Sequence, residues 1–480
     1  MSRALLPLAA ALMLAGCSLA PTYERPSIEL PEGFASQAAV PAPDNAAAHP
    51  GWRSLFGDPA LRRLVELALE RNQDLRIAAL NIERARAQWT AAGADRLPSL
   101  SASYSGTRSQ PRSAGNSNAV NSAHTLGLGF SAFELDFFGR VANLSEAARA
   151  QFLATAEARR SAEISLVAEV ANTYLAWRGA VESAALTENT LKGREESFRL
   201  VGLKAERGAA SELDRVQAQS LVEAARASLA QFRRQQQQSA NALVQLTGST
   251  GLPALPGSLP LADEGLVATL PASLPSALLD RRPDLRQAEQ VLRAADANIG
   301  AARAAFLPRF SLTASAGVAS PALDDLLSDG TRAWSLAGNL VQPIFDFGRN
   351  RANLDAARTQ AEIAVAQYRK AVQVALRETA DALAGLETYE VQMRAQQAQA
   401  EAEQKRYDLT DLRYRAGASS QLDQLDAQRS LLATQQAAVQ SRVSLLQARV
   451  ALYRALGGDW SEPIRDERDV PRPDAASAAR

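Results

Sequence analysis

The sequence predicts a mixed α+β membrane protein with an internal duplication, in which three chains contribute four strands each to a twelve-stranded transmembrane β-barrel that long helices continue. Three observations support this prediction. Asp74-Leu-Arg76 recurs as Asp284-Leu-Arg286, at an offset of 210 residues (284 − 74). Each half holds two segments in which apolar residues alternate with small polar ones, which is the period of a strand. Each half also holds a very long helical pattern that no proline interrupts.

The composition narrows the function classes. The 52 basic and 52 acidic residues balance, so no basic excess predicts a nucleic-acid partner. The single cysteine and the two histidines exclude a disulfide framework and most His/Cys metal clusters. We therefore expect no metal, no cofactor and no enzymatic activity.

Residues 1–16 have the features of a secretory signal peptide, with Arg3 followed by an apolar run. The run ends in Leu14-Ala-Gly-Cys17, which resembles the bacterial lipobox and implies cleavage before Cys17 and acylation of that residue. An ordinary leader with a chance cysteine is the alternative interpretation. Residues 17–57, rich in Pro and Ala, are expected to form a lipidated N-terminal arm that extends along the folded body.

The first repeat, residues 58–250, begins with a helix that we expect to continue unbroken towards Pro98. Asp58 is a typical N-cap residue, and Pro59 suits the first helical position. Apolar residues at helical spacing, from Leu61 onwards, form one face of this helix.

Two strands are predicted beyond Pro98, at about 99–107 and 125–135. In both, one face is apolar and the other carries small polar residues, as in a barrel strand with lipid outside and water inside. A half-buried hairpin of a soluble protein would show the same alternation. Gly139-Arg140 marks the joint to a long helix that starts at about residue 141.

A connector rich in Pro and Gly, residues 251–275, leads to the second repeat, residues 276–458, and a charged tail follows at 459–480. The second pair of strands is predicted at about 310–318 and 333–342. Asp346-Phe-Gly348 spells a kinase tripeptide, but no kinase loops accompany it, so we interpret it as a strand-to-helix turn. The predicted strand–helix joints are Pro98, Gly139, Arg140, Pro308, Pro343, Gly348 and Arg349.

A helical turn is predicted near Gly417, where one long helix ends and another begins. The glycine permits a positive φ, and Ser419 or Ser420 can cap the next helix. From Leu422 a mostly apolar series then advances in alternating steps of three and four, with Arg429 and Gln436 as its polar members, which is the pattern of a coiled-coil seam. A weaker copy of this turn lies at Gly208.

The strand count predicts the assembly. No stretch of eighteen apolar residues follows the leader, so a closed barrel is the remaining way to cross a bilayer. Four strands cannot close a barrel, and eight would leave an interior filled with side chains. Three chains supply twelve strands around an open lumen, which predicts a homotrimer whose helix hairpins enclose a conduit.

The chain as a whole resembles the TolC family of outer-membrane efflux ducts, and within it the OprM-type lipoproteins. This resemblance implies a lipid-anchored trimeric duct of the bacterial outer membrane, with a helical barrel in the periplasm and an equatorial belt. It also implies docking to a periplasmic adaptor (membrane fusion) protein and an inner-membrane RND pump. Besides the lipobox, the motifs that carry it are Pro21-Thr-Tyr-Glu-Arg-Pro26, Trp52-Arg53, Asp58-Pro-Ala-Leu61, Asp74-Leu-Arg-Ile-Ala-Ala-Leu80, Phe345-Asp-Phe-Gly-Arg349, Tyr414-Arg-Ala-Gly417, Leu425-Asp-Ala-Gln428 and Leu452-Tyr-Arg-Ala-Leu-Gly-Gly458.

The resemblance further implies a periplasmic gate at the helical turns. The family pattern places acidic rings and an apolar constriction there, and Ser419 stands where some members have an arginine, so that latch is not carried over. A threefold axis would bring like charges together, so such a ring should bind cations or hold protons. Alternatively, the acidic residues at the turns are solvated side chains that the helix dipole stabilises at the start of a helix. The gate residues implied by the family motifs are Asp214, Tyr414, Leu422, Asp423 and Asp426.

Two other functions remain open at the level of sequence. A structural or adaptor lipoprotein could use the coiled-coil hairpins as a periplasmic spacer without a channel, although four barrel-type strands argue against it. An enzyme is the third interpretation, for which no clustered His, Cys or nucleotide-binding loop exists. Drug, solvent, aromatic-acid and metal export are all compatible with a wide duct.

Overall fold

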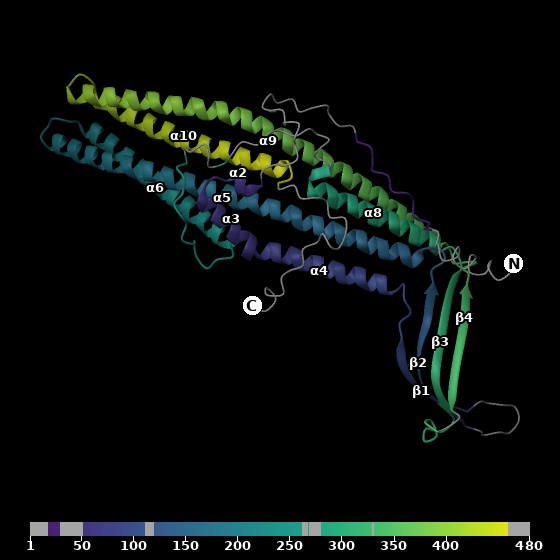
Figure 1. The fold of residues 1–480 in the computed structure, drawn as a ribbon. Helices are drawn as coiled ribbons and strands as arrows, with labels where there is room; N and C mark the ends of the chain where they lie inside the picture. The colour runs from purple at the N-terminus through teal and green to yellow at the C-terminus, as the bar shows by residue number, and fades with distance from the viewer. Residues whose placement is uncertain are drawn as a thin grey trace. The chain divides into compact units, whose positions relative to one another are not determined.

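The computed structural model describes residues 18–28, 51–110, 120–261, 267, 280–328 and 331–458. Helices account for most of the described chain, and the four strands are short by comparison (Figure 1). In chain order, the elements are α2 (Trp52–Leu55), α3 (Pro59–Arg71), α4 (Gln73–Ala94), β1 (Ser101–Ser109), β2 (Asn121–Leu135), α5 (Arg140–Glu206), α6 (Glu212–Leu246), α8 (Pro283–Ala304), β3 (Arg309–Ser320), β4 (Arg332–Val341), α9 (Arg349–Arg415) and α10 (Gln421–Ala455).

The element order repeats, and so do the element lengths. Helices α4 and α8 each have 22 residues, α5 and α9 each have 67, and α6 and α10 each have 35. Each repeat therefore runs helix, two strands, long helix, return helix. The internal duplication predicted from the sequence is confirmed.

The four strands form one antiparallel sheet in the order β1-β2-β3-β4 (Figure 1). The first hairpin pairs Tyr104 with Leu126, and the second pairs Ala316 with Trp334. The central pairing, β2 with β3, joins the two repeats and sets Leu126 opposite Val318. A bulge between Phe130 and Phe133 shifts this register near the helix-linked end of β2.

The single helix expected between Asp58 and Pro98 is wrong, because the chain breaks at Asn72. This residue is extended, with φ −62° and ψ 129°, and separates α3 from α4. Its side-chain oxygen accepts a hydrogen bond from the Leu75 backbone N–H at 3.0 Å, and its amide nitrogen donates to the Leu246 carbonyl at 3.0 Å. A buried side chain that satisfies groups on two helices outweighs the continuous apolar pattern around it.

Contacts divide the chain into two compact units. One contains the sheet together with Leu80–Ala156 and Gln287–Arg369, and the other contains the remaining helices, so α4, α5, α8 and α9 contribute to both. The first unit has a small core between α8 and α9, around Leu292, Ile299 and Ala364. The second has a larger core that α2, α3, α5, α9 and α10 share.

Asp58 anchors the larger core. Its carboxylate accepts a hydrogen bond from the Ala60 backbone N–H at 2.8 Å, which is the predicted N-cap of α3, and another from the Tyr174 hydroxyl at 2.7 Å. The Arg178 guanidinium lies 3.6 Å away and also donates to the Leu259 carbonyl. Burial and the hydrogen bond to Asp58 raise the pKa of Tyr174 well above its usual range. The cap is therefore a buried, charge-compensated junction between α3 and α5.

The described part of the N-terminal arm is extended and lies against α5 and α8. The Ser18 hydroxyl donates to the Asn143 side chain at 2.9 Å, and Arg303 donates to the Leu19 carbonyl at 2.9 Å. Arg25 forms an ion pair with Glu289 at 2.9 Å. Cys17 and the predicted signal peptide lie outside the described residues.

Within the described ranges, no helix combines the length and the apolar character needed to cross a bilayer.

Candidate helical turns and gate

The two helical turns that connect α5 to α6 and α9 to α10 have the same backbone geometry. Gly208 has φ +72° and Gly417 has φ +75°, a conformation that favours glycine. The Ala209 N–H donates to the Lys204 carbonyl at 2.8 Å, and the Ala418 N–H donates to the Arg413 carbonyl at 2.8 Å. These are the bonds of a Schellman motif, so the glycine-terminated turn predicted from the sequence is present in both repeats. Figure 1 shows both turns at the same end of the two helix hairpins.

Asp423 and Asp214 form capping boxes at the starts of the return helices. One Asp423 oxygen accepts hydrogen bonds from the Ser420 hydroxyl at 2.7 Å and the Ser419 hydroxyl at 3.0 Å. Ser420, rather than Ser419, is the N-cap of α10, and Ser211 holds Asp214 in the same way in α6. These hydroxyl hydrogen bonds hold the pKa of Asp423 and of Asp214 below the ordinary value. Within one chain, both aspartates thus have the structural role of helix-start acids.

Asp426 has a different environment, because two arginines hold it. Arg406 on α9 donates to one carboxylate oxygen at 2.5 Å, and Arg429 on α10 donates to the other at 2.6 Å. Arg406 also forms an ion pair with Glu403 at 3.0 Å. The Asp426 charge is thereby compensated and ties the two helices of the hairpin together.

Tyr414 links the second hairpin to the first. The Lys204 ammonium donates to the Tyr414 hydroxyl at 3.2 Å and lies 5.2 Å from the centre of the tyrosine ring. Hydrogen bond and cation–π contact therefore act on the same pair of residues. The contact joins the end of α5 to the end of α9, beside the two glycine turns.

Leu422 and Asp426 lie together in a groove of about 220 Å³ between α6 and α10. Leu422 is 60% exposed, which is unusual for a leucine at the start of a coiled-coil seam. Gln217, Ser220, Leu221, Leu425 and Arg429 complete the lining. The structure thus brings Leu422 and Asp426 together, whereas Asp423 and Asp214 lie in their separate caps.

Three residues of this region were not identified from the sequence as functional: Lys204, Arg406 and Arg429. Arg406 could have been found from the hairpin itself, since it precedes Gly417 by about as many residues as Asp426 follows it. Positions equally distant from the turn of an antiparallel helix pair face each other. The Lys204 contact has no comparable signal, because it joins two hairpins rather than the two arms of one.

The predicted strand–helix joints lie at the helix-linked ends of the sheet. Pro98 and Pro308 precede β1 and β3, and Pro343 lies between β4 and α9. Gly139 and Gly348 have φ +70° and +83°, and they lead directly into α5 and α9.

Carboxylates satisfy the first backbone groups of both long helices at these joints. Asp136 accepts from the Ala142 N–H at 2.7 Å, and Asp346 accepts from the Asn350 N–H at 2.9 Å. Asp346-Phe-Gly348 is therefore a strand-to-helix turn, as interpreted from the sequence. Arg140 forms a two-pronged ion pair with Glu134, at 2.8 and 2.6 Å, whereas Arg349 at the equivalent place is exposed.

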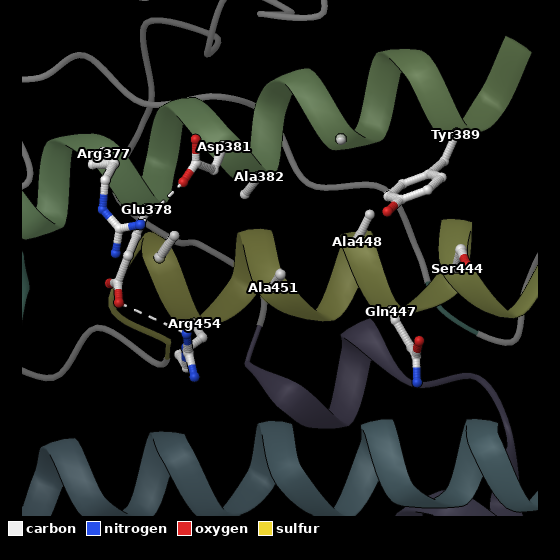
Figure 2. Close-up of a pocket in the computed structure, with 12 residues that line it drawn as sticks. Arg377, Glu378, Asp381, Ala382, Tyr389, Ser444, Gln447, Ala448, Ala451 and Arg454 are labelled. Atoms are coloured by element: carbon white, nitrogen blue, oxygen red, sulfur yellow. Dashed lines mark ion pairs between the residues drawn. The ribbon is translucent and has the colours of Figure 1, made fainter. Parts of the chain in front are cut away.

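A second groove, of about 390 Å³, runs between α9 and α10 (Figure 2). Its floor consists of small side chains, including Ala382, Ala448 and Ala451. Its charged residues pair with one another, Arg377 with Asp381 at 3.6 Å and Glu378 with Arg454 at 3.7 Å. The groove thus presents alanines that permit close approach of another helix, rather than unpaired charges that would hold a small ligand. Over the described ranges, no cluster of three His, Cys, Asp or Glu residues has the arrangement of a metal site.

This chain is similar over most of its length to known proteins of one family. The family model described as outer membrane efflux protein matches residues 64–249 and 274–458, which is one match in each repeat. The chain is 45% identical over 471 residues to the antibiotic efflux pump outer membrane protein ArpC of Pseudomonas putida, covering 96% of this chain and 97% of the relative. It is equally similar, with the same coverage, to the toluene efflux pump outer membrane protein TtgC of Pseudomonas putida. The crystal structure of the open state of the Neisseria gonorrhoeae MtrE outer membrane channel superposes with a TM-score of 0.84 at 39% identity, over 92% of this chain and 98% of that one.

Proposed function

Since this chain belongs to the outer membrane efflux protein family and is a passive efflux channel of the outer membrane rather than an enzyme, we propose that its helical turns form a gate that opens towards a pump in the inner membrane. The observation that carries this proposal is the pair of matched turns. Both repeats end their long helices at the same glycine geometry, and both place an aspartate in the first turn of the return helix.

The sheet explains how the chain crosses the membrane. Its edge strands, β1 and β4, each expose one side to pairing, so a single chain has two open edges. Three copies of a four-stranded sheet close into the twelve-stranded barrel of this trimeric family, and closure removes every edge.

We propose that the complete machine contains a periplasmic adaptor protein and an RND-class pump. The support is the family itself, whose relatives are named as outer membrane proteins of efflux pumps. Two relatives of equal similarity to this chain are named as outer membrane proteins of an antibiotic efflux pump and of a toluene efflux pump, and these exported compounds are chemically unlike. A duct that serves both with one architecture leaves selection of the compound to the pump.

We assign the closing contacts of the gate to Asp423, Asp426 and Leu422, with Asp214 as the counterpart in the first repeat. Around a threefold axis, three copies of each carboxylate form a ring that attracts cations. The exposed Leu422 side chain supplies the apolar part of the constriction. The Lys204–Tyr414 contact joins the two hairpins, and we assign Tyr414 to the closing contacts as well.

Planar-bilayer recordings test the gate through Asp423→Asn combined with Asp426→Asn. Asparagine at position 423 keeps a side-chain oxygen that can accept from the Ser420 N–H, so the variant removes charge without removing the capping box. We expect a higher single-channel conductance and weaker block by divalent cations. Asp355→Asn, on the exposed side of α9, is the matched control and should leave both quantities unchanged.

If conductance and cation block are unaltered in the double variant, these aspartates do not take part in the gate. That result would leave them as helix-start and hairpin-stabilising acids, which is the role that their contacts have within one chain. Tyr414→Phe removes the hydrogen bond from Lys204 and should raise conductance less than the double aspartate variant does, because the cation–π contact remains.

A further inference from the structure

One face of the sheet is apolar and the other is lined by small polar groups. The strand register sets Tyr104, Leu126, Val318 and Arg332 in one row on the same face. Alternate residues share a face, so this face also carries Ala102, Leu128, Phe130, Ala314, Ala316, Trp334, Leu336 and Leu340. The opposite face carries Ser101, Ser103, Ser105, Thr125, Thr313, Ser315 and Ser335. In a water-filled barrel, the apolar face is the one that contacts lipid.

Two arginines end this apolar face. Arg332 lies in the row of Tyr104, and Arg108 lies four residues beyond Tyr104 on the same face. Both side chains are exposed, and neither takes part in an ion pair with another described residue. Tyr104, at 54% exposure, and Trp334, at 80%, lie on the same face close to them.

These arginines belong to the outer rim of the membrane. They lie at the hairpin-loop ends of the strands, whereas the opposite ends continue into the long helices, which are periplasmic in this family. From Leu340 to Arg332 the strand advances eight residues (340 − 332), or roughly 26 Å. Counted with both ends these are nine residues (340 − 332 + 1), within the roughly 9–11 that a strand tilted by about 45° needs to cross a bilayer, and aromatic residues border the apolar band of such barrels. The guanidinium groups therefore lie at the level of the outer lipid headgroups.

Barrel closure brings the strands that carry the two arginines together. The sheet order makes β1 and β4 the edges, so three copies close only if β4 of one chain lies beside β1 of the next. Each seam is then bordered by one strand that carries Tyr104 and Arg108 and by a neighbouring chain's strand that carries Arg332 and Trp334. The cluster is complete only in the trimer and occurs three times.

We propose that each seam binds the phosphate groups of a phosphorylated glycolipid of the outer leaflet. Guanidinium groups bind phosphate through paired, charge-assisted hydrogen bonds, and aromatic side chains anchor at the headgroup level. A lipid, rather than a free anion, is the ligand because the cations continue directly into the apolar band that accommodates acyl chains. The Tyr104 hydroxyl is held by His124 at 2.9 Å, and the two rings stack, which fixes one wall of the site. This inference rests on the trimeric barrel and is independent of the gate.

Native mass spectrometry of the detergent-purified trimer tests the site, with a diphosphorylated acyl-disaccharide lipid and its dephosphorylated form as probes. We expect the wild type to retain up to three phosphorylated lipids per trimer. Arg108→Gln combined with Arg332→Gln should weaken this binding about tenfold or more, as expected for the loss of two charge-assisted contacts. Replacement of both arginines by lysine should weaken binding less than glutamine does, because the charge is kept while the paired hydrogen bonds are lost. Arg351→Gln, an exposed arginine on α9, is the matched control and should bind as the wild type does.

Three results would overturn the proposal. Equal retention of the phosphorylated and dephosphorylated lipids by the wild type would show that only apolar contacts bind the lipid. Unchanged binding by the glutamine variant would exclude the arginines. Dissociation of the glutamine variant into monomers in lipid-free detergent would instead make them seam ion pairs, for instance with Asp324 or Asp325 of the β3–β4 loop. Conductance in phosphocholine bilayers should not change in any variant, which separates this site from the efflux function.

Discussion

At the scale of single residues, hydroxyl and carboxylate groups determine where the return helices begin. Ser420 and Asp423 satisfy each other's backbone N–H groups at the start of α10, and Ser211 and Asp214 do so in α6. Asp426, one turn further on, instead binds arginines from both arms of its hairpin. Three aspartates that look alike in sequence thus have two distinct physical roles within the chain.

The cap on α10 can be tested by Ser420→Ala. The substitution removes the hydroxyl that bonds both the Asp423 carboxylate and the Asp423 N–H. We expect amide exchange of residues 421–424 to become about fivefold faster, as for the loss of a typical N-cap. Ser419→Ala is the control, since it removes only one hydrogen bond to the carboxylate and keeps the cap. Equal protection in the two variants would contradict the assignment of Ser420 as the cap.

The same measurement has a defined pH dependence. The pKa of Asp423 is lowered in the folded chain from its ordinary value of 3.8, so its contribution to stability is fully present above that value. This contribution is lost as the pH falls below 3.8 and through the folded-state pKa. Protection of the first turn should therefore be constant near neutral pH and decrease in strongly acidic buffer, and Ser420→Ala should reduce that decrease, because the Ser419 hydroxyl and the Ser420 N–H still lower the pKa of Asp423.

At the scale of elements, the pairing of β2 with β3 is the contact that makes one sheet from two repeats. It requires close backbone approach at Gly317, where a Cβ atom would lie 2.1 Å from the Leu126 carbonyl oxygen. A Cβ atom added to Gly338, on the neighbouring strand β4, would have open space around it. The β2 backbone therefore leaves no room for a side chain at position 317, whereas a side chain fits at position 338.

Gly317→Ala should lower the temperature at which the heat-modifiable trimer dissociates on gel electrophoresis. The added methyl group cannot be accommodated without moving the β2 backbone, because the obstructing atom is a carbonyl oxygen and not a flexible side chain. Gly338→Ala is the matched control and should leave the dissociation temperature unchanged. If the two variants dissociate at the same temperature, the β2–β3 pairing does not limit the stability of the sheet.

At the scale of the whole molecule, the barrel and the predicted lipid are two separate attachments to the membrane. A closed barrel inserts stably by itself, because every backbone polar group of its strands is paired, so insertion does not depend on the acyl anchor. The arm next to Cys17 is also held by protein contacts, through Arg303 on the Leu19 carbonyl and Arg25 on Glu289. We therefore propose that acylation of Cys17 assists targeting and is not required for the trimer.

Cys17→Ser tests this division. The variant should lose metabolic labelling with palmitate and still migrate as a trimer in outer-membrane fractions, because neither the strands nor the arm contacts change. Arg303→Gln with Arg25→Gln in the same background should release the arm, detected as faster proteolysis within residues 18–28. A monomer from Cys17→Ser alone would show that the lipid is needed for assembly.

The sequence by itself determined the strands, the long helices, the duplication and the family. Alternation with period 2, helical spacing, the turn glycines and the capping serines are all local signals, since each acts within a few residues of the backbone. Only the tertiary structure decided that Asn72 interrupts the first helix, that β2 pairs with β3, and that Arg406 and Lys204 bind Asp426 and Tyr414. The physical reason is that such contacts depend on the register between segments far apart in the chain, and a side chain on a long exposed helix has many possible partners until packing selects one.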